Sequence, residues 1–281
     1  LAWLSVRSQG GEMVLRIEDL DPDRCREEYA VTLMEDLTWL GLTWDEGPYW
    51  QSRRRDLYEK ALRALGQDVY PCFCTRAQLH AASAPHRGDG VFRYPGTCRA
   101  LTPKEIAEKA KNRAPALRWR APDEDVLFCD KFRGPQQMNV QKTFGDFLVR
   151  RSDGVHAYQL AVSVDDAAMG ITEVVRGNDL LSSTPCQLLL IRALQGKAPV
   201  YGHVPLLVAP DGRRLSKRER DLDMGALRDR FSPARLCGKL AWLLGLIDRP
   251  EPVPAKELIP LFPGAKLPRD HIEVQHDMFG R

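Results

Sequence analysis

Three cysteines lie close together in the chain, in an arrangement that could bind a metal ion. Cys72 and Cys74 form a Cys-x-Cys pair, and Cys98 follows after a loop. Zinc prefers thiolates and is usually four-coordinate in structural sites, so these cysteines would supply three of its four ligands. Three residues in the loop compete for the fourth position: His80, His86 and Tyr94. On the residues alone, a zinc site and three unligated thiols both stay open.

A basic loop in the second half of the chain could act on a phosphate group. It follows the apolar run at residues 203–207 and has the sequence Arg213-Arg214-Leu215-Ser216-Lys217-Arg218. A cation on a flexible loop can follow negative charge as that charge moves onto a leaving phosphate. The alternative is a solvated basic turn, which the loop in isolation favours.

Arg176 and Glu18 each lie at the end of a run that predicts a buried strand. Side chains at the carboxyl ends of parallel strands face the edge where α/β proteins bind ligands. A guanidinium there can clamp a substrate carboxylate with two hydrogen bonds. The structural alternative for Arg176 is an ion pair with Asp165 or Asp166. Glu18 is by itself only one of several acids at a strand end.

Alternating strands and helices would position these residues. Residues 1–9 predict a helix that ends at two glycines, and residues 12–19 predict a buried strand. Asp21 would cap a helix that Gly41 closes, and residues 53–65 predict a second amphipathic helix. Because strands and helices alternate, we expect a parallel α/β sheet.

The middle of the chain has a different pattern. From about residue 70 to residue 143 it is rich in Gly, Pro and Arg, with a helix at residues 103–113 and a short strand at residues 116–120, and we interpret it as an insertion. Strand-like runs return at residues 146–154, 158–166 and 171–179, before a helix at residues 184–194. The chain then turns helical, so we expect four parts: residues 1–69, 70–143, 144–220 and 221–281.

Composition and charge limit the class of protein. Of 281 residues, 43% are hydrophobic and 28% charged, which is typical of a globular protein with one or two domains. No apolar run reaches the roughly 18 residues of a membrane span and no secretory signal is visible, so we expect a cytoplasmic protein with no membrane contact. A net charge of +3 is too small to indicate nucleic-acid binding, and seven cysteines without a secretory signal do not predict a disulfide framework.

Four runs in the second half of the chain resemble a known catalytic domain. Residues 146–154, 158–166, 171–179 and 203–218, in that order, are similar to the second half of the catalytic domain of glutamyl-tRNA synthetases, which are class I aminoacyl-tRNA synthetases. Within that group the chain more closely resembles the short glutamyl-Q tRNA(Asp) synthetase family. Three features carry this likeness: the Cys-x-Cys, Tyr, Cys set, the apolar Val162, and the short stretch after Lys217.

The resemblance implies a fold and a set of site residues. The fold would be a class I, Rossmann-like parallel sheet with a zinc-containing insertion and a short helical C-terminal region. Lys217 would bind ATP and act in catalysis by neutralising phosphate charge. Glu18, Tyr158 and Arg176 would bind glutamate. One structural Zn²⁺ would have four ligands: Cys72, Cys74, Tyr94 and Cys98.

The resemblance also implies a reaction and partners. Members of the family activate L-glutamate with ATP, expected to be accompanied by Mg²⁺, and transfer the glutamyl group from its adenylate to queuosine in the anticodon of tRNA(Asp). We expect a monomer. The strand and first signature that the family places before Leu1 are missing, so residues 1–69 would be an incomplete first half of the catalytic domain. Two alternatives stay open: a truncated glutamyl-tRNA synthetase that charges the tRNA 3′ end, and a non-catalytic tRNA-binding module.

Overall fold

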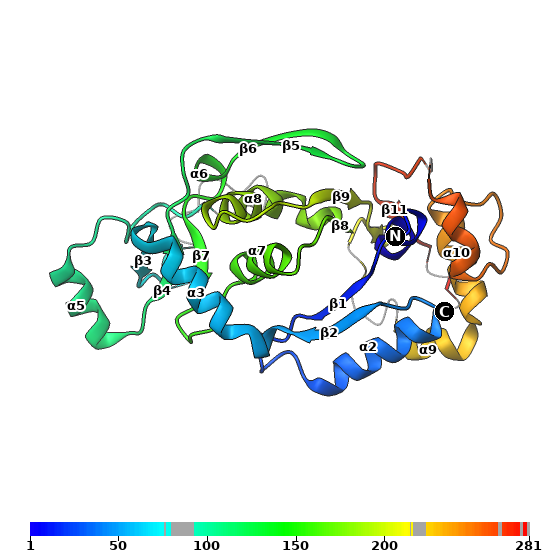
Figure 1. Cartoon of the computed structure of the whole chain (residues 1–281), viewed down its shortest axis with the longest axis horizontal. Coiled ribbons are helices and arrows are strands. Elements are labelled where there is room, and N and C mark those ends of the chain that lie inside the picture. The colour runs from blue at the N-terminus through cyan, green and yellow to red at the C-terminus, as the bar shows by residue number, and fades with distance from the viewer. Residues whose placement is uncertain are drawn as a thin grey trace.

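Two parallel strand pairs, connected and flanked by helices, organise the fold (Figure 1). The computed structural model describes residues 1–75, 77–79, 93–213, 215, 223–263, 266–275 and 278–279. Strand β1 (Val14–Ile17) pairs in parallel with β2 (Glu46–Trp50), and β8 (Glu173–Gly177) pairs in parallel with β9 (Val200–Val204). The expected α/β class with parallel strands is confirmed.

The free edges of β1 and β8 border a cavity of about 560 Å³. Among the described residues, β1 pairs only with β2 and β8 only with β9. The cavity is also lined by α1 (Ala2–Ser8) and by residues at the end of α7 (Tyr158–Ala168) and just after it. The two strand pairs are therefore separate sheets with open edges that face a common space.

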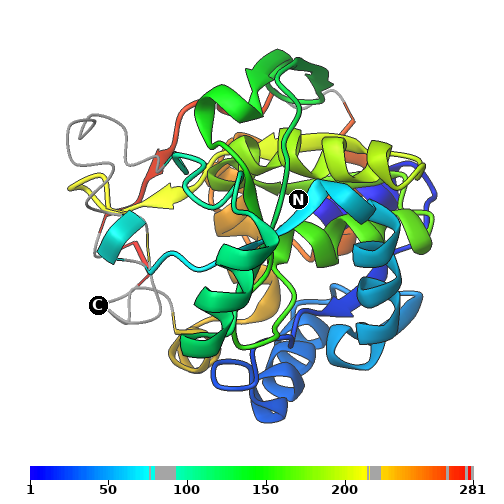
Figure 2. The ribbon, with the colours of Figure 1, turned by 90° about the vertical axis from the view of Figure 1, so that its left-hand side faces the viewer.

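The segment between the two strand pairs forms an antiparallel sheet and a hairpin. β3 (Val69–Cys72), β4 (Ala116–Trp119) and β7 (Phe147–Arg150) form the sheet, and β5 (Asp125–Asp130) pairs with β6 (Gly134–Asn139). Helix α5 (Pro103–Asn112) begins with a reciprocal cap between Thr102 and Glu105. Figure 2 views the molecule from the end that carries α5. The short helix α6 (Val140–Thr143) follows the hairpin.

Three helices pack around the main hydrophobic core. α3 (Arg55–Leu65), α7 and α8 (Thr184–Ala193) contribute almost fully buried side chains, among them Tyr58, Leu160 and Leu190. A second core joins α1 to α10 (Pro233–Leu243) and the 3-10 helix η5 (Ala255–Leu261). The remaining elements are short: η1 (Gln51–Arg54), η2 (Gly66–Asp68), η3 (Asn178–Ser183), β10 (Leu207–Val208), α9 (Met224–Arg230) and β11 (Ile272–Glu273). In the described part of the chain, every helix is too short or too polar to cross a membrane.

Two sequence predictions about secondary structure are wrong in detail. The run at residues 158–166, expected to be strand-like, lies in α7, where every residue from Leu160 to Asp166 is buried. A helix buried on all sides lacks the apolar stripe that distinguishes it from a buried strand. Helix α2 (Glu27–Trp39) starts later than expected, because the backbone N–H groups of Arg24 and Cys25 donate to Asp21 O in a turn. Gly41 follows its end at φ +75°, as predicted.

Asp165 on α7 is a buried carboxylate that joins several elements. Its side chain is inaccessible to solvent and accepts hydrogen bonds from Gln51 Nε2 at 2.8 Å, Tyr58 OH at 2.8 Å and Arg54 Nε at 2.7 Å. Arg16 of β1 lies 3.8 Å away. A buried charge is tolerated only when partners of this kind surround it. Asp165 therefore fixes α7 against η1, α3 and β1.

The substitution Asp165→Ala should lower the free energy of unfolding by about 3–5 kcal/mol, because it leaves Arg54 without its buried partner. The exposed Asp248 offers a matched control, and Asp248→Ala should change stability by less than about 0.5 kcal/mol. Urea denaturation followed by circular dichroism measures both. Equal stability of the two variants would contradict the role given to Asp165.

Candidate functional site

Arg176 lies at the carboxyl end of β8, opposite His203 of β9. Its Nε donates to His203 Nε2 at 3.0 Å, and its Nη2 lies 2.8 Å from Thr184 Oγ1 and 3.4 Å from Leu180 O. Its Nη1 is 3.5 Å from Tyr158 OH. Nε and Nη2 of the guanidinium are therefore engaged, and Nη1 has only a long contact with a hydroxyl.

Every hydrogen-bond partner of Arg176 among the described residues is a neutral group. The alternative of an ion pair with Asp165 or Asp166 is not what the structure has, because these carboxylates bind Arg54 and Arg16. A guanidinium whose charge is not neutralised by the protein favours an anionic ligand. With Nη2 already bonded to Thr184 and Leu180, the group facing such a ligand is Nη1.

Tyr158 is the first residue of α7, and 38% of its surface is exposed. Its hydroxyl lies 3.5 Å from Arg176 Nη1, and the residue lines a cavity of about 440 Å³. Partial burial raises the pKa of Tyr158, while the positive charge of Arg176 opposes this shift. Tyr158 is thus a neutral hydroxyl that can donate a hydrogen bond to the same anion as Arg176.

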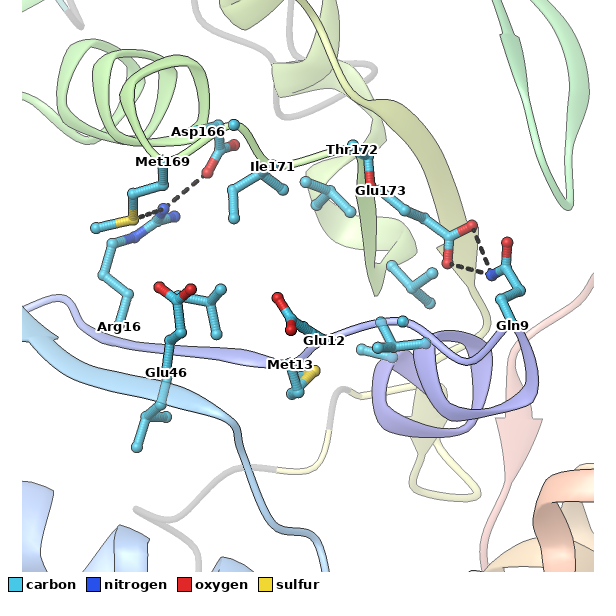
Figure 3. Close-up of a pocket in the computed structure, with 18 of the residues that line it drawn as sticks. Gln9, Glu12, Met13, Arg16, Glu46, Asp166, Met169, Ile171, Thr172 and Glu173 are labelled. Carbon is cyan, nitrogen blue, oxygen red and sulfur yellow. Dashed lines mark hydrogen bonds and ion pairs between the residues drawn. The ribbon is translucent and has the colours of Figure 1, made fainter.

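Glu18 lies just beyond the carboxyl end of β1, at one end of the cavity between β1 and β8. Arg16 Nη2 is 3.4 Å from Glu18 Oε1, and Arg16 Nη1 is 2.7 Å from Asp166 Oδ1. Figure 3 shows Arg16 and Asp166 facing each other at that end, with Glu173 at the other. Burial raises the pKa of Glu18 against the opposing charge of Arg16. The two carboxylates share one arginine, so this end of the cavity can also attract a cation.

Asp166 is 2% exposed, and its Oδ2 has no hydrogen-bond partner among the described residues. The same holds for Arg16 Nε, which is also buried. Buried polar atoms are normally paired. These two atoms lie on residues that line the cavity, so the cavity is polar at a point where a further group could satisfy them.

The three cysteines expected to bind a metal are brought together. The sulfur atoms of Cys72, Cys74 and Cys98 all lie within 4.8 Å of one another, with Cys74 and Cys98 3.6 Å apart. Sulfur atoms around a tetrahedral zinc would be about 3.8 Å apart, given Zn–S bonds of about 2.3 Å. Tyr94 OH is 3.6 Å from Cys72 Sγ and accepts the backbone N–H of Cys98 at 2.8 Å. The donor set could hold a metal ion.

Arg118 supports this cluster from the side. It is 6% exposed, donates from Nε to Cys72 Sγ at 3.3 Å, and stacks on the Tyr94 ring at 3.7 Å. Burial and the neighbouring sulfur atoms raise the pKa of Cys74 to about 12. The Cys74 thiol therefore resists ionisation in the absence of a cation, and a metal ion bound beside it would relieve this cost.

Three residues singled out from the sequence lie outside the described residues: Lys217, His80 and His86. Sequence reasoning also missed functional neighbours of Arg176. His203 belongs to the apolar run noted before the basic loop, but no pattern marked it as a partner of an arginine. Asp130, which binds His203 Nδ1 at 2.6 Å, is 73 positions away in the sequence, so no local pattern predicted this contact.

Comparisons with known proteins agree with one another. A family model described as the catalytic domain of class I tRNA synthetases (E and Q) matches residues 1–233. A glutamyl-Q tRNA(Asp) synthetase of Symbiobacterium thermophilum is 50% identical over 289 residues, which cover 98% of this chain and 89% of that protein. Another, of Nitratidesulfovibrio vulgaris, is 49% identical and is covered to 91% by the whole of this chain.

A solved structure has a similar fold. It is the crystal structure of a glutamate tRNA ligase from Elizabethkingia meningosepticum in complex with its amino acid, with a TM-score of 0.80 and 25% sequence identity. The match covers 99% of this chain but 63% of that ligase. This chain therefore spans less than two thirds of the length of the ligase.

Proposed function

This chain belongs to the class I tRNA synthetases for glutamate and glutamine, and we propose that it works as a glutamyl-Q tRNA(Asp) synthetase. It is an enzyme of the ligase type. The observation that carries the proposal is the 50% and 49% identity to two proteins so named, over nearly all of this chain and most of theirs. The substrates are L-glutamate, ATP and tRNA(Asp) with queuosine in its anticodon.

Arg176 and Tyr158 would bind the side-chain carboxylate of glutamate. The neutral partners of Arg176 leave its charge for the substrate, and Nη1 and the Tyr158 hydroxyl face the same position. Glu18 would bind the α-ammonium group. It lies beside Asp166 at the carboxyl end of β1, where two carboxylates share one arginine.

The reaction would proceed in two steps, activation of glutamate and transfer of the glutamyl group. A glutamate α-carboxylate oxygen attacks the α-phosphorus of ATP, and the bond to pyrophosphate breaks, which gives glutamyl-adenylate. Lys217 would neutralise the charge that builds on the phosphates, and Mg²⁺ would accompany the ATP. The activated acyl group then passes to a hydroxyl of queuosine, and AMP leaves.

Zinc is the metal that best suits the cysteine cluster. Three thiolates and a phenol oxygen offer the sulfur-rich, four-ligand set that structural zinc sites use. The ion would be held by Cys72, Cys74, Tyr94 and Cys98. It would thereby link β3 to the loop before α5. Arg118 would keep Cys72 and Tyr94 in place from outside.

The cavity between β1 and β8 supports the expected missing strand. Among the described residues both bordering strands have a free edge, and two buried atoms beside the cavity, Arg16 Nε and Asp166 Oδ2, have no hydrogen-bond partner. A further strand parallel to β1 and β8 would join the two strand pairs into one sheet. That strand and residues 1–69 would then together form the first half of the catalytic domain, with residues 70–143 inserted before the second half.

Zinc content gives a direct test of the metal site. The purified protein should contain about one zinc per chain by mass spectrometry, because the four donors match its coordination. Cys98→Ala should lose most of it, and Cys186→Ala, at a buried cysteine outside the cluster, should keep it. Equal metal content in the two variants would contradict the assignment.

Hydrogen exchange tests the strand. In a version of the protein extended by the residues encoded immediately upstream, the amide hydrogens of β1 and β8 should exchange more slowly than in the 281-residue protein. The physical reason is that a strand between them would bond to both free edges. Protection that changes only in α1 would argue against a strand in the cavity.

The location of the glutamyl group tests the function itself. The protein, with any upstream residues that its gene encodes, is incubated with labelled glutamate, ATP and tRNA(Asp) with or without queuosine, and the tRNA is then digested with nuclease. We expect label on the wobble nucleoside, dependent on queuosine. Arg176→Gln should lower kcat/KM for glutamate by about a hundredfold or more, since it removes the positive partner of the substrate carboxylate. Arg192→Gln, at an exposed arginine of α8, is the control.

The other outcomes separate the alternatives. Label on the 3′-terminal adenosine would identify a truncated glutamyl-tRNA synthetase. Binding of tRNA without any labelling would identify a non-catalytic binding module. Loss of activity in Arg192→Gln to the same degree as in Arg176→Gln would remove the specific role given to Arg176.

A further inference from the structure

A buried aspartate and histidine lie behind the guanidinium of Arg176. Asp130, at the end of β5, is 1% exposed, and His203 of β9 is fully buried. Asp130 Oδ2 lies 2.6 Å from His203 Nδ1, within hydrogen-bonding distance. Its Oδ1 accepts three backbone N–H groups at 3.0–3.1 Å: those of Phe132, Arg133 and His203. The two oxygens therefore have separate partners, the backbone for Oδ1 and the imidazole for Oδ2.

The protonation state of the pair follows from these contacts. Burial alone would raise the pKa of Asp130, but its hydrogen bonds lower it overall, so the carboxylate is ionised. Burial and the nearby charge of Arg176 lower the pKa of His203 against the opposing effect of Asp130, so the imidazole is neutral. An ionised Asp130 fixes the single proton of the ring on Nδ1.

The tautomer of His203 decides how Arg176 can lie. With the proton on Nδ1, Nε2 is a bare acceptor, and Arg176 Nε donates to it at 3.0 Å. With the proton on Nε2, two N–H donors would face each other, since an arginine Nε always carries a hydrogen. Only one tautomer therefore permits the observed position of the guanidinium.

We propose that Asp130 and His203 are positioning residues that hold Arg176 with its Nη1 directed at the substrate carboxylate. The inference rests on the proposed function, in which Arg176 binds the glutamate side chain. Asp130 selects the acceptor tautomer of His203, and His203 then fixes the Nε side of the guanidinium, while Thr184 fixes Nη2 at 2.8 Å. The neutral ring positions the arginine without cancelling the charge that the carboxylate needs.

The substitution Asp130→Asn separates positioning from simple packing. The amide oxygen of the asparagine can keep the three backbone N–H bonds of Oδ1, so the turn after β5 retains its anchors. Its NH₂ group then replaces Oδ2 and points at His203 Nδ1, which must become an acceptor. The ring proton moves to Nε2 and meets Arg176 Nε. The variant thus has nearly the native shape and the wrong tautomer.

Steady-state kinetics of Asp130→Asn should show a rise of about ten- to a hundredfold in KM for glutamate, the effect of losing one hydrogen bond to a charged group. KM for ATP should stay within about twofold. Glu59→Gln is the matched control, because Glu59 also binds a buried histidine, His156 Nε2, at 3.0 Å, away from Arg176. It should leave both KM values unchanged.

A spectroscopic readout is independent of activity. In ¹⁵N-labelled protein, the imidazole of His203 should carry its proton on Nδ1, and in Asp130→Asn on Nε2. A protonated Nε2 or a charged ring in the unchanged protein would overturn the inference, whatever the substrate. So would an unchanged KM for glutamate in a folded Asp130→Asn variant, or an equal rise in KM for ATP.

Failure of the proposed function has a different signature. If the unchanged protein neither binds glutamate by calorimetry nor uses it, the proposed function is wrong, and the role of the pair in glutamate binding falls with it. If the unchanged protein uses glutamate and Asp130→Asn does so with the same KM, only the positioning inference is wrong.

Discussion

Two adjacent buried carboxylates on α7 hold the site together. Asp165 binds Arg54, Gln51 and Tyr58, and Asp166 binds Arg16 of β1. These contacts tie α7, which begins with Tyr158, to the strand that ends before Glu18. Because a buried charge left without partners is strongly unfavourable, the relative position of α7 and β1 has little freedom. These ion pairs therefore constrain the distance between the two ends of the candidate site.

Three partly buried arginines, Arg16, Arg54 and Arg176, differ in the charge of their partners. Arg16 and Arg54 face carboxylates, so their positive charge is neutralised within the protein. Arg176 is bonded only to neutral groups among the described residues, although it is partly buried in the same region. The difference explains why the first two act as structural links, whereas the third suits an anionic substrate. Sequence position alone does not separate these roles, because Arg16 and Arg176 both lie within predicted strands.

The sequence predicted local structure where the local signals are strong. Helix α5 begins with a Thr102 and Glu105 cap, α8 has Pro185 in its first turn, and both helices lie where they were expected. The cysteines and Tyr94 also meet as their pattern indicated. The run that became α7 was misassigned because burial on every side removes periodicity. The contact between Asp130 and His203 joins residues that are 73 positions apart, and no local sequence pattern predicts such a contact.

The contacts between the predicted insertion and β9 are those that the sequence predicted least well. A division of the chain at residue 143 places Asp130 in the insertion and His203 in the second half of the catalytic domain, yet their side chains are 2.6 Å apart and fully buried. The loop after β5 also packs against β9, since Lys131 N–H donates to Tyr201 O and Phe132 contacts Gly202. The segment that carries the cysteine cluster is thus continuous with the one that holds Asp130 beside His203. The end of β5 and the loop after it are therefore linked to β9, and so to the candidate site, by hydrogen bonds.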